Sequence, residues 1–286
     1  MIPFAVASAD ETSSRPSNAR GDDAALYHAG REWLMDLHER CRRGDPPAGS
    51  WTALPDPATV ETVAGEGFDF VVVDTEHTPA SFETVENCVR AVETTGDTEA
   101  FVRVARHDHV RIKRALDTGV TGLMAPRVNT ASAARDLVDA TRSPPAGDRG
   151  VAAARASEYG RDLDGYYDRA GDELTVLAQI ETETGLSNAG DIAAVDGVDA
   201  LFVGPADLSA GVGAFGDYDA EAFETAVEGV LADAAEADAP VGTLATSPAE
   251  VETWRQRGFD FLIVGTDVGY LRSGAAESLA AYDATR

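Results

Sequence analysis

The sequence predicts an α/β protein of the (β/α)8 TIM-barrel class. Short apolar segments rich in β-branched and aromatic residues alternate with amphipathic helical stretches, from residue 49 to the C-terminus of the 286-residue chain. This alternation indicates right-handed βαβ units and a parallel sheet, and eight repeats suit a closed barrel. A doubly wound open sheet is the alternative. We expect one barrel domain over residues 24–286, after an acidic, disordered tail at residues 1–23.

The elements can be placed in order along the chain. An extra N-terminal helix is predicted over 24–43 and ends at the breaker cluster 44–47. The longest connection, 143–172, is expected to pack over the barrel mouth or against a neighbouring subunit. Strands are predicted at 49–53, 68–74, 100–104, 122–126, 174–180, 200–203, 240–244 and 259–264, with helices at 57–64, 82–92, 110–117, 131–141, 220–237 and 248–257.

Composition narrows the function classes. The net charge of −27 and the pI near 4.3 argue against a nucleic acid or an anionic membrane surface as partner, because either would repel this chain. Lys113 is the only lysine, and an acidic, lysine-poor chain is typical of salt-loving microbes such as haloarchaea. Cys41 and Cys88 are too few for a disulfide framework, which favours a reduced cytoplasm. No window is long and apolar enough to span a bilayer.

A polar cluster follows the second predicted strand. Asp74, Glu76 and His77 come directly after four apolar residues, at the strand end where barrels carry their active sites. An aspartate three residues from a histidine can fix its tautomer and raise its basicity, as a general acid/base requires. The alternative is that Asp74 caps the following helix and His77 is a polar loop residue.

Arg103 lies inside the third predicted strand. A buried guanidinium is costly unless it meets an anion, so we expect a salt bridge to Asp74 or Glu76, a contact with a ligand, or both. At a barrel mouth, this arginine could also polarise a substrate carbonyl or hold an enolate oxygen.

Two carboxylates end the fifth and sixth predicted strands. Glu181 follows one strand, and Asp207 follows the other through a Gly204-Pro205 turn. Gln179 has the same strand parity as Glu181 and is expected to line the same pocket. Oxygen ligands without cysteine or histidine favour a hard divalent ion, Mg²⁺ or Mn²⁺, whose remaining positions accept water and a chelating 2-oxo acid.

Other motifs carry less weight. The letters of 211–216 match GxGxxG, but a dinucleotide site must directly follow a strand, so a flexible loop is the better interpretation. His107 and His109 lack a third ligand nearby and are expected to be surface residues. Lys113 lies in a helical stretch, which makes a Schiff-base mechanism improbable.

Together these residues resemble the HpcH/HpaI aldolase/citrate lyase family, specifically its metal-dependent pyruvate aldolases. The resemblance covers the chain from about Gly49 onward. The matching pieces are Gly67-Phe68-Asp69-Phe70 before Asp74-Thr75-Glu76-His77, then Val102-Arg103, Ala125-Pro126-Arg127-Val128-Asn129-Thr130, Pro144-Pro145-Ala146-Gly147-Asp148-Arg149-Gly150, Gln179-Ile180-Glu181-Thr182 and Gly204-Pro205-Ala206-Asp207-Leu208-Ser209.

The resemblance implies a TIM barrel, usually hexameric with an exchanged C-terminal helix, that reversibly cleaves 4-hydroxy-2-oxo acids or 2-keto-3-deoxy sugar acids into pyruvate and an aldehyde. It implies a divalent metal, Mg²⁺, Mn²⁺ or Co²⁺, on Glu181 and Asp207 beside Gln179. It further implies that His77 is the acid/base, oriented by Asp74 and supported by Glu76, and that Arg103 stabilises the enolate oxygen. Backbone amides of Ala206 and Asp207 would receive the pyruvate carboxylate. The mouth loops, including 143–172 and Leu244, are expected to select the aldehyde.

Three alternatives are open. A CoA-thioester lyase of the same superfamily would need a nucleotide-binding cluster that the sequence does not reveal. A non-catalytic barrel that binds acidic metabolites would show no turnover. An NAD-dependent oxidoreductase would depend on the glycine loop at 211–216.

Overall fold

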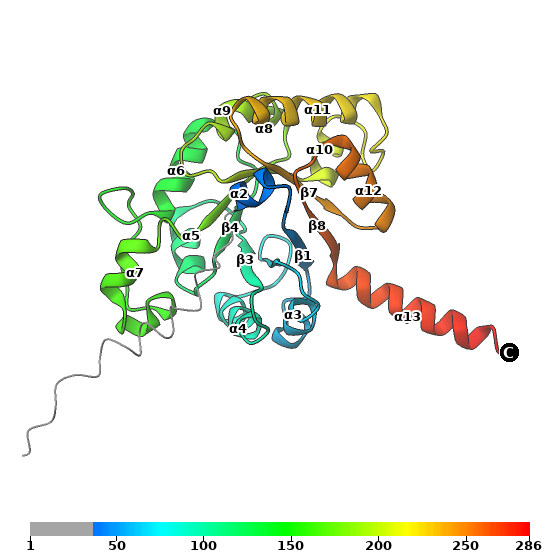
Figure 1. Ribbon diagram of the computed structural model, residues 1–286, viewed down its shortest axis with the longest axis horizontal. Helices are drawn as coiled ribbons and strands as arrows, with labels where there is room; N and C mark the ends of the chain where they lie inside the picture. Colours follow the sequence, from blue (N-terminus) through cyan, green and yellow to red (C-terminus); the bar gives the residue numbers. More distant parts are fainter. Residues whose placement is uncertain (1–36) are drawn as a thin grey trace, which may run out of the picture. The chain divides into compact units, whose positions relative to one another are not determined.

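The computed structural model describes residues 37–286, which form a closed barrel of eight parallel strands in the order β1 to β8 (Figure 1). The (β/α)8 prediction is confirmed, and the open-sheet alternative is wrong because β8 pairs with β1. The predicted tail at 1–23 and most of the predicted helix at 24–43 lie outside the described residues. The described part of that helix is α2 (Leu37–Arg42).

Every predicted strand is present, with shifts of a few residues at the ends. The fourth strand is the shortest of those that precede the long connection, and the eighth runs on to Thr266. The strands are β1 (Ala48–Thr52), β2 (Phe70–Asp74), β3 (Glu99–Arg103), β4 (Gly122–Ala125), β5 (Thr175–Ile180), β6 (Ala200–Val203), β7 (Val241–Ala245) and β8 (Phe261–Thr266).

The six predicted interstrand helices are also present, and shorter helices occupy the loops. The interstrand helices are α3 (Pro57–Ala64), α4 (Phe82–Glu93), α5 (His109–Leu116), α6 (Ala131–Thr141), α11 (Glu221–Glu236) and α12 (Pro248–Arg257). The others are η1 (Arg155–Gly160), α7 (Leu163–Arg169), α8 (Glu183–Leu186), α9 (Ala189–Ala193), α10 (Pro205–Gly211) and α13 (Asp267–Asp283).

Large aromatic side chains fill the inside of the barrel. Phe70 and Phe101 stack with ring centroids 4.7 Å apart, and Phe261 lies 6.5 Å from Phe70. Glycine on an adjacent strand makes the room: a Cβ on Gly49 would lie 2.3 Å from the Phe70 ring. Burial of each phenylalanine contributes about 1.5–3 kcal/mol. The inside of the barrel is therefore a packed core, and chemistry is confined to its carboxyl-end mouth.

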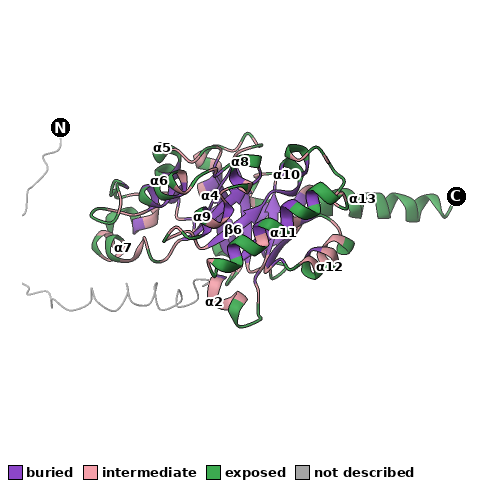
Figure 2. Cartoon of the chain, turned by 90° about the horizontal axis from the view of Figure 1, so that it is seen from above, coloured by how far each residue is buried: buried purple, intermediate pink, exposed green. Residues whose placement is uncertain are grey.

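The outer helices bury their apolar faces on the strands, as the central purple strands of Figure 2 show. Several of these helices begin with a side-chain cap. Ser81, Asp108 and Thr130 each accept a hydrogen bond from a backbone N–H of the first turn of α4, α5 and α6. Each such cap contributes roughly 1 kcal/mol and fixes where the strand-to-helix loop ends. The mouth loops are thus short and well anchored.

The long connection at 143–172 packs against outer helices. Arg149, only 5% exposed, reaches Asp117 and the hydroxyl of Tyr166. Arg155 donates to the carbonyl of Thr118 at 2.8 Å, just past the end of α5. The contacts within the described chain thus hold this segment on the outside of the barrel, and the expectation that it covers the mouth is not confirmed.

The C-terminal helix α13 leaves the barrel and has little cover from the chain itself (Figure 1). Its first residue, Asp267, is buried and accepts hydrogen bonds from the backbone of Ala53 and Leu54. From residue 269 onward every residue is exposed, including the apolar side chains of Leu271 and Leu279. Among residues 37–286, no helix has both the length and the apolar character needed to cross a membrane.

Candidate active site

A buried ion-pair cluster lies at the carboxyl ends of β2 and β3. Parallel pairing places Asp74 directly beside Arg103, and the two form a bidentate pair with both N···O distances at 2.9 Å. The third side of the guanidinium, Nη1, lies 3.1 Å from Oε2 of Glu76. The Trp51 ring packs 4.5 Å from Cζ of Arg103. The expected salt bridge to Asp74 or Glu76 is confirmed with both acids, which compensates the cost of burying this charge.

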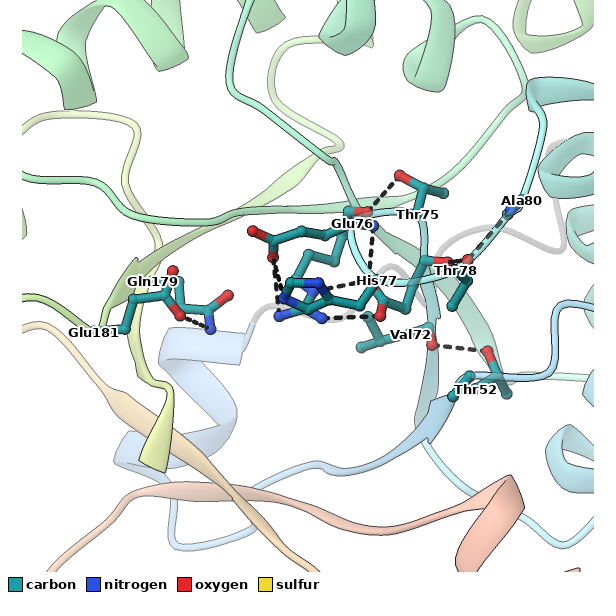
Figure 3. A network of polar contacts seen from close by, with 12 residues as sticks. Thr52, Val72, Thr75, Glu76, His77, Thr78, Ala80, Gln179 and Glu181 are labelled. Carbon is teal, nitrogen blue, oxygen red and sulfur yellow. Dashed lines mark hydrogen bonds and ion pairs between the residues drawn. The ribbon is translucent and has the colours of Figure 1, made fainter. Parts of the chain in front are cut away.

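His77 is held at the edge of this cluster but is not oriented by Asp74. Its side chain is 68% exposed, and its Nε2 lies 4.0 Å from Oε2 of Glu76 (Figure 3). Both oxygens of Asp74 bind Arg103, and Oδ1 also accepts from the backbone of Glu76 at 2.9 Å. The predicted Asp74–His77 contact is therefore wrong, because the permanently charged guanidinium takes the carboxylate. The carboxylate closest to the imidazole is Glu76.

The turn that carries His77 is fixed by its neighbours. Thr75 bonds the carbonyl of Arg103 twice, through its backbone N–H at 3.0 Å and its hydroxyl at 2.7 Å. The hydroxyl of Thr78 donates to the carbonyl of Asp74. The turn is thus tied to β2 and β3 on both sides of His77, which presents an exposed imidazole on a rigid support.

Glu181 lies buried at the end of β5, only 4% exposed. Its Oε1 accepts from the backbone N–H of Arg127 at 2.9 Å, and its Oε2 accepts from Nε2 of Gln179 at 2.5 Å. Burial, followed by the charges of Asp207 and Glu76, raises the pKa of Glu181 to about 7. The carboxylate is therefore short of positive charge in the metal-free protein.

Asp207 approaches from the first turn of α10, after the Gly204-Pro205 turn. A Cβ on Gly204 would lie 2.6 Å from Nε2 of Gln179 and 2.8 Å from Oε2 of Glu181. Only glycine lets the β6 loop come this close to the end of β5. The predicted juxtaposition of Glu181 with Asp207 is supported by the contribution of the Asp207 charge to the raised pKa of Glu181.

The donor set fits a hard divalent ion. Oε1 of Gln179 is buried without a hydrogen-bond partner, and it lies beside a carboxylate whose neighbours are also acidic. Within residues 37–286, no cluster of three or more histidine, cysteine or acidic side chains forms a complete metal cage. Mg²⁺ and Mn²⁺ commonly use one or two protein carboxylates and take water and substrate as further ligands, so this partial oxygen set suits them.

Ala206 and Leu244, the remaining predicted site residues, make no polar side-chain contact with the site within residues 37–286. Ala206 is exposed in the first turn of α10. Leu244 is half-buried near the end of β7, where it packs on the inner core. The lone lysine, Lys113, is on outer helix α5. The glycine run at 211–216 follows α10, not a strand, so the dinucleotide fingerprint is absent there. His109 starts α5 and pairs with Asp148 at 3.0 Å.

Three contributors were not predicted from the sequence. Arg127 supplies a backbone N–H, Gly204 supplies close approach, and Trp51 supplies the ring behind Arg103. The sequence does contain a signal for Gly204, because a glycine between a strand and a proline indicates a tight turn. No sequence signal shows the other two, because each contact joins residues far apart in the sequence on different strands or strand ends.

Residues 48–274 match the model of the HpcH/HpaI aldolase/citrate lyase family. The chain belongs to this family. It is 40% identical over 238 residues to a 4-hydroxy-2-oxovalerate aldolase of Novosphingobium aromaticivorans, covering 83% of this chain and 90% of the relative. It is 38% identical over 241 residues to a 2-dehydro-3,6-dideoxy-6-sulfogluconate aldolase of Pseudomonas putida, covering 84% and 94%. The crystal structure of a family member from Burkholderia cenocepacia J2315 superposes with a TM-score of 0.82 at 36% identity, covering 86% and 98%.

Proposed function

We propose that this protein is a divalent-metal-dependent pyruvate aldolase. It reversibly cleaves a 4-hydroxy-2-oxo acid, or a 2-keto-3-deoxy sugar acid, into pyruvate and an aldehyde. One observation carries this proposal: two different groups of side chains lie at the same barrel mouth. The first is the carboxylates of Glu181 and Asp207, which lack a cationic partner in the described chain. The second is the buried guanidinium of Arg103, which two acids hold in place. The 38–40% identity to aldolases over more than four-fifths of the chain supports it.

Glu181 and Asp207 would hold the metal, with Gln179 beside them. When bound, Mg²⁺, Mn²⁺ or Co²⁺ would supply Lewis-acid stabilisation of the negative charge on the 2-oxo oxygen. The substrate's carboxylate would meet backbone N–H groups of Ala206 and Asp207. These groups precede the first bond of α10, from Leu208 N to Gly204 O, and are thus available to an anion.

Arg103 binds the developing enolate oxygen. Two of its five N–H groups donate to Asp74, and its Nη1 forms an ion pair with Glu76 at 3.1 Å; these contacts fix the plane of the guanidinium and leave N–H groups of Nη1 for substrate. Because the guanidinium is held before substrate arrives, it needs no reorganisation as charge develops.

His77 moves the proton of the 4-hydroxyl group. Its exposed imidazole can reach a substrate in the mouth, and Glu76 at 4.0 Å is the adjacent carboxylate. Burial raises the pKa of Glu76, and the Arg103 charge opposes that rise. Glu76, in place of Asp74, is thus the carboxylate next to the histidine. A Schiff-base route has no support, because the sole lysine lies on an outer helix.

The exposed apolar side chains of α13 favour a homo-oligomer in which this helix packs on a second copy, with a hexamer as the expected assembly. The acidic, lysine-poor composition favours a cytoplasm rich in salt. Analytical ultracentrifugation across KCl concentrations tests both suggestions.

The experiment that tests the function is pyruvate release from a panel of 4-hydroxy-2-oxo acids in high salt. Release should stop in EDTA and return with added Mn²⁺, Mg²⁺ or Co²⁺. Borohydride with pyruvate should leave the protein unlabelled. Full activity in EDTA, or stable labelling of Lys113, would contradict the metal mechanism.

A further inference from the structure

Arg127 has an unusual backbone conformation at the mouth of the barrel. Its φ is 53°, in the left-handed region, where a residue other than glycine loses roughly 1–2 kcal/mol. Three other non-glycine residues in the described chain share this feature, and none of them follows a barrel strand. Such strain persists where the surroundings over-determine it, and it gathers at functional sites.

Two hydrogen bonds hold Arg127 in this conformation. Its N–H donates to Oε1 of Glu181 at 2.9 Å, and the next N–H, of Val128, donates to the carbonyl of Gln179 at 3.1 Å. Pro126 and Val128 are buried on either side, whereas Arg127 is exposed. The backbone of Arg127 thus lies directly beside the carboxylate of Glu181, and its long cationic side chain is at the surface of the mouth.

The guanidinium of Arg127 is free of ion pairs and hydrogen bonds to residues 37–286. This is notable in a chain with 50 acidic and 23 basic residues. On the β2–β4 side of the mouth, the carboxylates of Asp74 and Glu76 are taken by Arg103. The acids at the mouth without an ion pair in the described chain are Glu181, next to the backbone of Arg127, and Asp207, and both belong to the proposed metal site.

We propose that Arg127 binds a negatively charged group at the far end of the aldehyde half of the substrate. This rests on the proposed function, which places the pyruvate half at Glu181, Asp207 and Arg103, deep in the mouth. The aldehyde half then extends toward solvent, past the loop that carries Arg127. A guanidinium matches a carboxylate in planar, two-point geometry, so the favoured substrate class carries a second acid group.

Matched acceptor aldehydes test this in the aldol direction, with pyruvate and Mn²⁺. Succinate semialdehyde and butanal have the same carbon chain and differ in the terminal carboxylate. The wild type should favour the acid at least tenfold in kcat/KM, as a charge-assisted hydrogen bond allows. Arg127→Gln should lower this ratio at least tenfold, and Arg127→Lys should restore part of it. Arg106→Gln, at an exposed arginine on the preceding mouth loop, is the matched control and should keep the wild-type ratio.

Deuterium exchange at C3 of pyruvate needs no aldehyde and reports the metal site alone. If Arg127→Gln slowed this exchange and both aldehydes equally, the residue would act only through its backbone, and the inference would be wrong. An unchanged ratio, with or without a change in oligomeric mass, would also overturn it. If the wild type showed neither exchange nor any aldol product, the proposed function itself would fail, which is a distinct result.

Discussion

Replacing Glu181 with glutamine should stabilise the metal-free protein at alkaline pH. Folding raises the pKa of Glu181 from 4.5 to about 7, because the ionised carboxylate is buried beside other acids. A protonated Glu181 carries no charge to bury, so the favourable effect of its raised pKa on the free energy of unfolding is fully present below pH 4.5. It is lost as pH rises through about 7. At 1.36 kcal/mol per pKa unit, the ionised carboxylate costs the metal-free fold about 3 kcal/mol at pH 8.

Glutamine has the shape of the protonated acid and cannot ionise. The N–H of Arg127 can still donate to its amide oxygen, as it does to Oε1 of Glu181. Its amide nitrogen would face Gln179, whose buried Oε1 lacks a partner and can accept after a flip of that amide. The hydrogen-bond network therefore survives the change, and the charge alone is removed.

Urea unfolding at fixed KCl and protein concentration measures the effect. In EDTA, Glu181→Gln should gain about 2.5 kcal/mol over wild type between pH 5 and pH 8. With Mn²⁺ at a hundred times its Kd, the wild type should recover about 2.7 kcal/mol, and the variant far less. Exposed Glu66→Gln is the control and should follow the wild type. A variant that loses stability at pH 8 in EDTA would refute the reasoning.

Three further predictions concern the same site. Mn²⁺ affinity should fall as pH drops below about 7, approaching tenfold per pH unit, because a proton competes with the metal for Glu181. Calorimetry at pH 6 and pH 8 measures the affinity, and the same affinity at both would exclude Glu181 as a ligand. Arg103→Lys should lower kcat 100- to 1,000-fold, because an ammonium group cannot form the bidentate pair with Asp74 or present oriented donors to the substrate. Steady-state kinetics measures the loss, and circular dichroism should show that the fold is intact. Gly204→Ala should weaken Mn²⁺ binding, because its Cβ would lie 2.8 Å from Oε2 of Glu181. Unchanged affinity would mean that the loop after β6 can move to accept the methyl group. Gly190→Ala, on outer helix α9, is the control.

The barrel was readable from the sequence because each strand is a short apolar run bounded by turn residues. Strand ends were less certain: β7 begins at Val241, after Pro240, which has no N–H to join the ladder. The polar residues at the mouth could also be predicted, since Asp74 ends β2, Glu181 follows β5 and Asp207 lies in the first turn of α10, shortly after β6.

Pairings across strands were harder to predict. Asp74 and His77 are three residues apart, which suggested a contact along the chain, but β2–β3 register places Asp74 beside Arg103. The contact of Arg127 with Glu181 joins β4 to β5 over 54 residues and depends on a left-handed backbone. Local spacing carries no information about either contact, because both are set by the pairing of adjacent strands.

The charge arrangement gives the two halves of the site different requirements. Arg103 is already paired with two acids, so it orients a substrate oxygen but adds little net attraction for an anion. Glu181 and Asp207 repel the carboxylate of a 2-oxo acid until a cation neutralises them. In the proposed mechanism the metal would thus be required for binding as well as for chemistry, and substrate should enter only after it. Arg127, free of acidic partners within residues 37–286, is then the cation left to select what extends beyond the pyruvate half.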